Sequence, residues 1–537
     1  MKQTAANIAG VVVRWGLCAV IVWAFVWGVA QFYLPGKGFT FFLSLGDRNQ
    51  AHYLPELRGI APYIEAKSLG YDAQQYVQLA MRPQLSAPEL ATAVDTLPYR
   101  ARRILLSWTA WLVAGGDPVR AVHVFSVQNV VAWLALAGLL LRWLPPANGE
   151  NIARWSGVLF SVGLIWSVRG ALLDGPSLLL IAVGVALAER GQPWWSALVL
   201  GFSGLAKETN LLAGVVVLPA AYEGLRDWRS WFGQCVLLVL PLVLWLGCLL
   251  VWIGTQGDSG THNFGLPLAG YLTKWQVVLH HMRSHGFDSY ERYNVPVLVA
   301  LLTQCLFFLL RPRWTEFWWR VGAANAVLML FLGDAVWEIF PCAAVRVLLP
   351  MQLAFNIVVP RGGGRWWALL ILGNLSLLSM PSLLKPPAQE SHRIVGTQTL
   401  RIDAISGRSV EVTYGAGWLA SERSLLEYWR WADGSAELTI VNPQSTALAA
   451  ELRFGLRSPV VRQLQVCAPE KTLWSGEISK TRRDVLFAVV LPPGKTCFRF
   501  VTSDPATSPG HGDPRQLTFS MRDLQVVLRE RIDRTSP

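Results

Sequence analysis

The chain has 537 residues, of which 53% are hydrophobic and only 15% are charged. A soluble domain usually carries about 25% charged residues, so this composition argues against a string of soluble domains and indicates a polytopic membrane protein. The net charge of +12 fits positive cytoplasmic loops and contacts with an anionic lipid bilayer. It is no evidence of nucleic-acid binding, and no nucleic-acid partner is expected.

The charge is unevenly distributed along the chain. Residues 390–537 hold 19 Lys+Arg and 16 Asp+Glu, so 35 of 148 residues are charged, whereas residues 1–389 hold the other 47. This predicts a membrane module over 1–389 and a soluble domain over 390–537, joined at the hinge Lys385-Pro386-Pro387.

The first apolar run extends from Ile8 to Leu34 and is long enough to cross about 30 Å of hydrocarbon. It is too long for the apolar region of a signal peptide, so an uncleaved anchor is expected. Ten further runs lie near 120–143, 155–169, 176–188, 194–206, 209–222, 232–254, 295–310, 319–333, 342–359 and 366–384. Together they predict about 11 transmembrane helices, several of them short.

Positive charge predicts the orientation. Four basic segments should be cytoplasmic: 142–154, 223–229, 311–320 and 361–365. All four basic segments lie on the cytoplasmic side only if the short run 104–115 is an interfacial helix that does not cross the membrane. The N-terminus is then cytoplasmic, the soluble domain is extracytoplasmic, and 35–118 and 255–293 are long outer loops. The alternative is that 104–115 crosses and the topology is inverted downstream.

Three shorter outer turns, at 172–174, 207–209 and 333–341, carry charged residues. Because charge beside lipid is costly, these turns are expected to face a polar cavity.

The tail alternates polar and apolar residues over 409–414, 436–441, 463–467, 485–490 and 497–501. Turn signals such as Asp433-Gly434 and Asn442-Pro443 separate these strands. Short strands at this spacing predict a β-sandwich or jelly roll.

The outer loop 35–118 carries the clearest candidate for chemistry. Asp72 lies in Gly70-Tyr71-Asp72, and Arg100, Arg102 and Arg103 follow in the same loop. A carboxylate can take a proton from an acceptor hydroxyl, and guanidinium groups can hold a phosphate. The alternative is an amphipathic loop whose arginines meet lipid headgroups, with Asp72 capping a helix.

A large apolar module with an acidic first outer loop resembles the C-type glycosyltransferase superfamily, integral membrane enzymes that use polyprenyl-phosphate sugars. Residues 70–76 (GYDAQQY) and 99–105 (YRARRIL) are similar to a bacterial branch whose pattern is roughly GYDGQFY…YRxxRxLxP. The chain departs at Ala73 and Ser107, where Gly and Pro are common, and neither departure removes a functional group. The resemblance covers 1–384 loosely and implies a bacterial inner (plasma) membrane protein.

In that superfamily an acidic residue of the first outer loop acts as general base or binds a metal. The resemblance assigns this role to Asp72, with Asp47 as the second candidate and Tyr71 and Gln75 in support. A divalent metal is therefore possible as a cofactor.

The turn containing Lys207 and Glu208 resembles a basic-acidic element of the same branch. Lys207 could meet the donor phosphate, or it could form a Lys–Glu pair that fills a helical bend. Asp174 could line the same cavity or pair with Arg169.

Arg346 lies alone in an apolar run, where an unpaired cation is expensive. We expect it to contact a phosphate or a partner such as Asp334 or Glu338.

Four histidines lie in 255–293: His262, His280, His281 and His285. The i, i+4 spacing of His281 and His285 could ligate a metal. An interfacial amphipathic helix is the favoured interpretation.

The tail is rich in aromatic and polar residues around Trp418, Trp429 and Trp431. These resemble β-sandwich domains appended to bacterial surface-glycan enzymes, which implies glycan binding; the alternative is a Trp-rich core. Cys467 and Cys497 could pair in an oxidising compartment or remain separate thiols.

The leading hypothesis is a membrane glycosyltransferase that moves a sugar from a polyprenyl-phosphate-linked donor to an extracytoplasmic glycan, lipid or protein acceptor. Two alternatives are a transporter or flippase for a lipid-linked glycan, and a membrane scaffold with a glycan-binding tail. Many transporters are built from two related halves, and no internal repeat is visible in the sequence.

Overall fold

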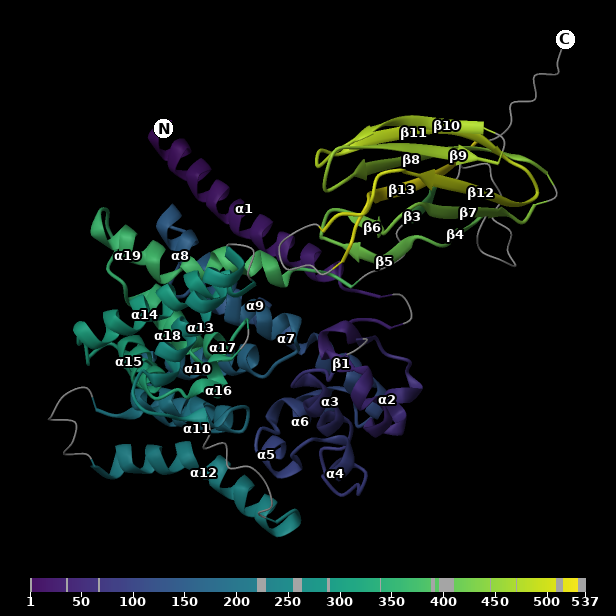
Figure 1. Cartoon of the computed structure of the whole chain (residues 1–537). Helices are drawn as coiled ribbons and strands as arrows, with labels where there is room; N and C mark the ends of the chain where they lie inside the picture. The colour runs from purple at the N-terminus through teal and green to yellow at the C-terminus, as the bar shows by residue number, and fades with distance from the viewer. Residues whose placement is uncertain are drawn as a thin grey trace. The chain divides into compact units, whose positions relative to one another are not determined.

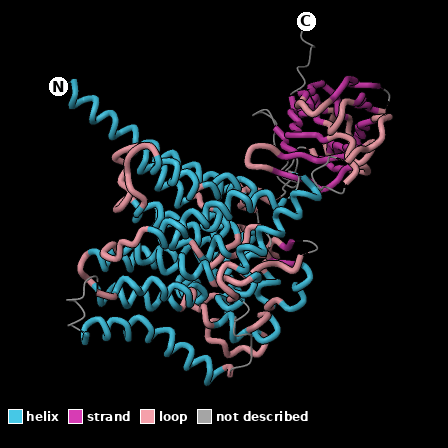
Figure 2. The backbone as a smooth tube through the Cα atoms, turned by 60° about the vertical axis from the view of Figure 1, so that its left-hand side comes forward, coloured by secondary structure: helices cyan, strands magenta, loops and turns pink. Residues whose placement is uncertain are grey.

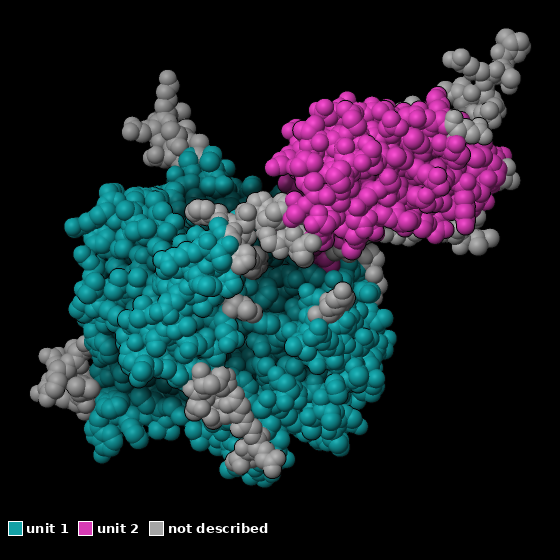
Figure 3. All heavy atoms as spheres, viewed as in Figure 1, with its two compact units in different colours: residues 1–286, 290–384 teal, residues 287–289, 385–537 magenta. Residues whose placement is uncertain are grey.

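The computed structural model describes residues 2–34, 37–65, 68–219, 228–254, 263–286, 290–338, 340–387, 392–395, 410–444, 446–469, 471–508 and 515–529. Two compact units make up the chain (Figure 3). Unit 1 comprises residues 1–286 and 290–384, and unit 2 contains residues 385–537. Helices build unit 1 and strands build unit 2 (Figure 2).

Unit 1 contains long and short α-helices (Figure 1). They are α1 (Lys2–Ala30), α2 (Pro55–Gly59), α3 (Ala73–Met81), α4 (Leu90–Ala93), α5 (Leu97–Ala101), α6 (Leu105–Val113), α7 (Pro118–Leu140), α8 (Gly149–Leu159), α9 (Val162–Arg169), α10 (Asp174–Glu189), α11 (Pro193–Gly204), α12 (Trp228–Trp252), α13 (Ala269–His285), α14 (Asn294–Leu310), α15 (Phe317–Leu330), α16 (Asp334–Trp337), α17 (Ala344–Val347), α18 (Leu349–Val358) and α19 (Arg365–Gly373). Its 3₁₀ helices are η1 (Thr40–Leu43), η2 (Asp47–His52), η3 (Glu208–Val217), η7 (Tyr290–Tyr293) and η8 (Leu375–Leu383), and its strands are β1 (Leu45–Gly46) and β2 (Ile64–Glu65).

Within the described residues, five helical segments are long and apolar enough to cross a membrane: Gly10–Ala30, Pro118–Leu140, Trp228–Trp252, Glu291–Leu310 and Arg365–Leu383. Large apolar side chains of α1 and α12 remain exposed, including Trp23 at 64% and Val251 at 80%. Apolar surface of this extent is favourable in lipid and not in water. The predicted membrane module is supported, whereas the predicted 11 spans are not confirmed.

Several predicted runs are interrupted rather than continuous. The run 155–169 is divided between α8 and α9, and 342–359 is divided between α17 and α18. Pro350 lies in the first turn of α18, a position that tolerates a residue without an N–H donor. The run 104–115 forms the nine-residue α6, about 13 Å long, which is too short to span a bilayer.

Three of the four basic segments predicted to be cytoplasmic contact one another. Nε of Arg361 donates to Oδ1 of Asn151 at 3.2 Å, and Nη2 of Arg361 donates to the carbonyl of Trp143 at 3.2 Å. Trp143 packs edge-on against Trp318 with ring centroids 5.1 Å apart. These segments therefore share one end of unit 1, as the topology requires, and the side of the membrane on which they lie stays a prediction.

The segment 35–118 forms most of a second hydrophobic core in unit 1, to which η1, α2, α3 and α6 contribute. Gly70 adopts a φ of 77°, and a Cβ there would collide with the side chain of Gln74. Glycine is required at this turn because an L side chain rarely adopts that φ. The turn delivers Tyr71 and Asp72 to the start of α3.

Unit 2 is formed by two mainly antiparallel sheets that enclose a core of aliphatic and aromatic side chains. The five-stranded sheet has the order β10-β9-β12-β7-β4, and the six-stranded sheet has the order β11-β8-β13-β6-β5, with β3 parallel to β13. The strands are β3 (His392–Val395), β4 (Glu411–Tyr414), β5 (Trp418–Arg423), β6 (Tyr428–Ala432), β7 (Ala436–Asn442), β8 (Leu448–Arg457), β9 (Arg462–Ala468), β10 (Lys471–Ile478), β11 (Arg483–Leu491), β12 (Gly494–Val501) and β13 (Ser520–Arg529). The predicted all-β sandwich is confirmed in its strand content, and residue 409 of the first predicted strand lies outside the described residues.

Candidate functional site

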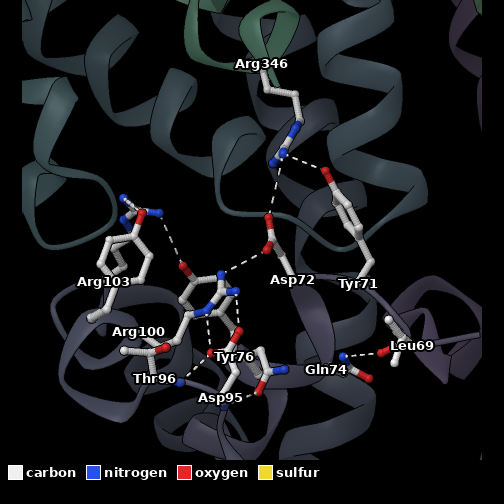
Figure 4. A network of polar contacts seen from close by, with 12 residues as sticks. Leu69, Tyr71, Asp72, Gln74, Tyr76, Asp95, Thr96, Arg100, Arg103 and Arg346 are labelled. Carbon is white, nitrogen blue, oxygen red and sulfur yellow. Dashed lines mark hydrogen bonds and ion pairs between the residues drawn. The ribbon is translucent and has the colours of Figure 1, made fainter. Parts of the chain in front are cut away.

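Asp72 is held between two guanidinium groups at the start of α3 (Figure 4). Nη1 of Arg100 donates to Oδ1 of Asp72 at 2.9 Å, and Nη2 of Arg346 lies 3.6 Å from Oδ2. Asp72 occupies the N-cap position of α3, but its side chain makes no capping hydrogen bond. The capping explanation of Asp72 is therefore wrong, because its carboxylate is directed to the arginines.

The environment of Asp72 favours its ionised form. Burial would raise the pKa of this carboxyl group, but the charges of Arg100 and Arg346 outweigh burial and hold the pKa below its ordinary value. The side chain of Asp72 keeps 30% of its surface exposed. A paired carboxylate of this kind is a weak base until its cationic partners are drawn to another anion.

The aromatic rings of Tyr71, Tyr76 and Tyr99 organise the arginines. The hydroxyl of Tyr71 accepts a hydrogen bond from Nη2 of Arg346 at 2.9 Å. The ring of Tyr99 lies 5.7 Å from the guanidinium carbon of Arg100 and 4.8 Å from that of Arg103. Cation–π contacts of this kind help to keep like charges close together.

Acidic partners also pair with Arg100 and Arg103. Nη2 of Arg100 donates to Asp95 at 2.7 Å, and Nε of Arg103 donates to Glu208 at 2.9 Å. Arg102 lies near the Tyr99 ring at 5.8 Å and makes no ion pair with a residue that the structure describes. The basic segment predicted in the first outer loop therefore converges on one site, although two of its arginines are already paired.

A second set of ion pairs forms where three interrupted helices meet. Nζ of Lys207 donates to Oδ1 of Asp174 at 2.5 Å, and Nη1 of Arg346 donates to Oδ2 of Asp174 at 3.0 Å. The predicted Lys207–Glu208 pair is wrong, because Lys207 turns to Asp174 and Glu208 turns to Arg103.

Two other predicted pairings are corrected by the same geometry. Arg346 pairs with Asp174 and Asp72, whereas Asp334 and Glu338 are exposed. Arg169 does not pair with Asp174; its guanidinium carbon lies 3.8 Å from the centroid of the Phe41 ring. The carboxylate in reach of each cation depends on helix packing and not on proximity in the sequence.

The two ion-pair groups face a cavity of about 550 Å³ with one basic end and one apolar wall. Five cationic and three acidic side chains line its polar end: Arg100, Arg102, Arg103, Lys207, Arg346, Asp72, Asp95 and Glu208. The apolar wall comes from the segment 255–293 and from the stretch between α15 and α17: Phe264, Leu328, Leu332, Ala335, Val336, Ala343 and Val347. The excess of positive charge beside an apolar wall suits a ligand with an anionic head and a hydrocarbon tail.

Two predicted site residues have structural roles beside this cavity. Asp47 is exposed and accepts the backbone N–H of Ser68 at 3.0 Å; it is not among the described lining residues. Gln75 is buried and accepts the N–H of Asp95 at 3.1 Å, which fixes the loop carrying that carboxylate. Asp72 is therefore the better-placed candidate base.

Sequence reasoning missed three polar residues and the apolar wall. Tyr76 follows Asp72 by four residues, a spacing that puts both on one face of α3, and this signal was available. Asp95 and Tyr99 lie within the basic segment and could have been found as its partners. No local pattern marks the apolar wall, since its residues lie far along the chain.

The described residues do not form a metal site. No group of three or more His, Cys, Asp or Glu side chains among them could hold a metal ion. The carboxylates of Asp72 and Asp174, which lie in the two ion-pair groups of the candidate site, are paired with Arg100 and Lys207. His262 lies outside the described residues, as does the side chain of His285.

The predicted glycan-binding tryptophans do not share one face. Nε1 of Trp418 donates to the carbonyl of Glu437 at 3.0 Å, and its ring packs edge-on against Phe500 and Phe519 of the core. Trp418 is thus partly buried against the core. Trp429 and Trp431 alternate along β6 with the buried Ala432 and therefore lie on the other face of that strand. Cys467 and Cys497 are both free thiols.

No protein family and no curated protein matches this chain. Among solved structures, the chain is similar to the arabinosyltransferase EmbB from Mycobacterium smegmatis, with 10% sequence identity and a TM-score of 0.23. The similarity covers 96% of this chain, which spans 64% of the length of that protein.

Proposed function

We propose that this protein is a membrane glycosyltransferase that moves a sugar from a polyprenyl-phosphate-linked donor to an extracytoplasmic acceptor. The observation that carries the proposal is the Asp72 carboxylate, held between Arg100 and Arg346 at a cavity with a basic end and an apolar wall. An isoprenoid phosphate has the matching chemistry, because it joins an anionic head to a hydrocarbon chain. The apolar wall would contact the first isoprene units, and the arginines would bind the phosphate.

Binding of the donor also prepares the base. The phosphate competes with Asp72 for the guanidinium groups of Arg100 and Arg346, which make strong charge-assisted hydrogen bonds to phosphate oxygens. Engagement of Arg100 and Arg346 by the phosphate weakens their hold on Asp72, so the pKa of this carboxyl group rises from its depressed value. The carboxylate becomes a competent base only when the donor is in place.

In the transfer step, Asp72 accepts the proton of the acceptor hydroxyl, and the hydroxyl oxygen forms a bond to the anomeric carbon of the sugar. The bond between that carbon and the phosphate oxygen breaks, and its electron pair leaves on polyprenyl phosphate. Arg100, Arg346 and Lys207 stabilise the added negative charge of the leaving phosphate.

The proposal is tested with the full chain in lipid nanodiscs. A panel of synthetic polyprenyl-phosphate pentoses and hexoses is supplied with cell-envelope glycan as acceptor, and products are identified by mass spectrometry. We expect free polyprenyl phosphate and a glycosylated product for at least one donor. Movement of an intact donor across proteoliposome membranes without cleavage would instead support a transporter.

A further inference from the structure

The outer face of the six-stranded sheet in unit 2 carries a row of aromatic and cationic side chains. Ser520 of β13 lies opposite both Trp431 of β6 and Arg457 of β8. Two residues further along β13, Arg522 lies opposite Trp429. Because side chains alternate along a strand, these residues face away from the core.

Each of the two arginines in this row has one N–H group without an acceptor among the described residues. Arg522 is 8% exposed and its Nη1 donates to Glu427 at 2.6 Å, but its buried Nε has no hydrogen-bond partner in the described part of unit 2. The buried Nε of Arg457 likewise meets no acceptor there. A buried guanidinium N–H without an acceptor is costly, so these groups point to an acceptor supplied by a ligand.

A pocket of about 430 Å³ lies over this row, within the range of about 300–1,000 Å³ typical of small-ligand sites. Trp431, Arg457, Lys480 and Arg522 line it together with Ser458 and Ser508. No Asp or Glu is among the lining residues in the described part of unit 2. Three cations beside an indole ring therefore form a site with a net positive charge.

We propose that this pocket binds an anionic saccharide, with a sugar ring on the face of Trp431 and its carboxylate or phosphate on Arg457, Lys480 and Arg522. The indole offers a flat apolar surface to the C–H face of a sugar ring, and the guanidinium groups match planar or tetrahedral anions. The deep position of Arg522 disfavours a lipid headgroup, which meets exposed cations. The predicted extracytoplasmic location favours an acidic glycan over a nucleotide. This proposal is independent of the transferase activity.

The test measures binding to the full chain in detergent by isothermal titration calorimetry. The probes are an oligogalacturonide and its methyl ester, which has the same rings without charge, and a phosphorylated mannan fragment with its dephosphorylated form. We expect at least one acidic probe to bind about tenfold or more tightly than its uncharged counterpart. Removal of a single charge-assisted contact by Arg457→Gln or Lys480→Gln should weaken binding about tenfold.

The control variant is Lys495→Gln, which removes an exposed lysine from β12 in the other sheet and should leave affinity unchanged. Trp431→Ala should weaken binding of the acidic saccharide. Inorganic phosphate should compete only poorly with the saccharide for the parent protein. Equal binding of charged and uncharged probes, or binding of neither acid, overturns the proposal. So does competition by inorganic phosphate as effective as the saccharide, or an equal loss with Lys495→Gln. Binding to phosphatidylglycerol vesicles that the same variants abolish would assign the site to the membrane surface.

Discussion

Replacement of Asp72 by Asn removes the basicity of the proposed base while keeping its shape. The variant should fold, because neither guanidinium loses all of its partners. Arg100 keeps its ion pair with Asp95 at 2.7 Å, and Arg346 keeps its ion pair with Asp174 at 3.0 Å. A loss of activity can then be attributed to the site itself.

Two kinetic effects of Asp72→Asn follow from the proposed mechanism. A positioned general base contributes about 10²–10⁴-fold to rate, so Asp72→Asn should lower kcat at least about 100-fold. The donor KM should stay constant or fall, because the substitution removes the carboxylate that competes with the donor phosphate for Arg100 and Arg346. A fall in kcat without a rise in KM is the expected signature.

Initial rates are measured in nanodiscs with a radiolabelled polyprenyl-phosphate sugar, alongside a thermal melt of each variant. Asp47→Asn is the matched control, because Asp47 is a carboxylate of the same outer segment that accepts the Ser68 amide outside the cavity. Its turnover should remain near that of the parent protein.

Two results would refute the reasoning. Full turnover in Asp72→Asn together with inactivity in Asp47→Asn would assign the base to Asp47. Activity in both variants would remove the case for general-base transfer and move the transporter hypothesis ahead.

The pKa of Asp72 is depressed in the folded protein, so its ion pairs stabilise the fold above about pH 4. This stabilisation is lost as the pH falls through the pKa of the folded state. The difference in Tm between the parent protein and Asp72→Asn should therefore shrink toward about pH 3. Arg103→Ala should raise the donor KM about tenfold or more if its guanidinium contacts phosphate, and an unchanged KM in both Arg100→Ala and Arg103→Ala would assign these residues to headgroup anchoring. A reporter fused after Pro537 should be active only outside the cytoplasm, and cytoplasmic activity would contradict the topology. Gly70→Ala should lower the melting temperature and the activity together, because φ at this position is 77°. A left-handed backbone conformation costs about 1–2 kcal/mol for an L residue. A variant that melts at the parental temperature would show that the turn can adapt.

Composition and local periodicity were sufficient for the coarse architecture. The rise in charge density after residue 390 indicated a different second part, and period-two alternation located strands such as β7 and β9 within one or two residues of their ends. These signals depend on neighbours in the chain, so they survive without tertiary information. The same is true of the carboxylate and the basic cluster that the sequence places together in segment 35–118.

Partner choice among charged groups required the tertiary structure. Arg346 was expected to contact a phosphate or a nearby carboxylate such as Asp334 or Glu338, yet in the structure it binds Asp174 and Tyr71. Helix interruptions bring these distant segments to one cavity, and no local pattern encodes which carboxylate each cation reaches. Likewise, Trp418 and Trp431 look equivalent in the sequence. In the structure Trp418 packs against the core of unit 2 and Trp431 faces outward, because a shift of one residue along a strand moves a side chain to the opposite face of the sheet.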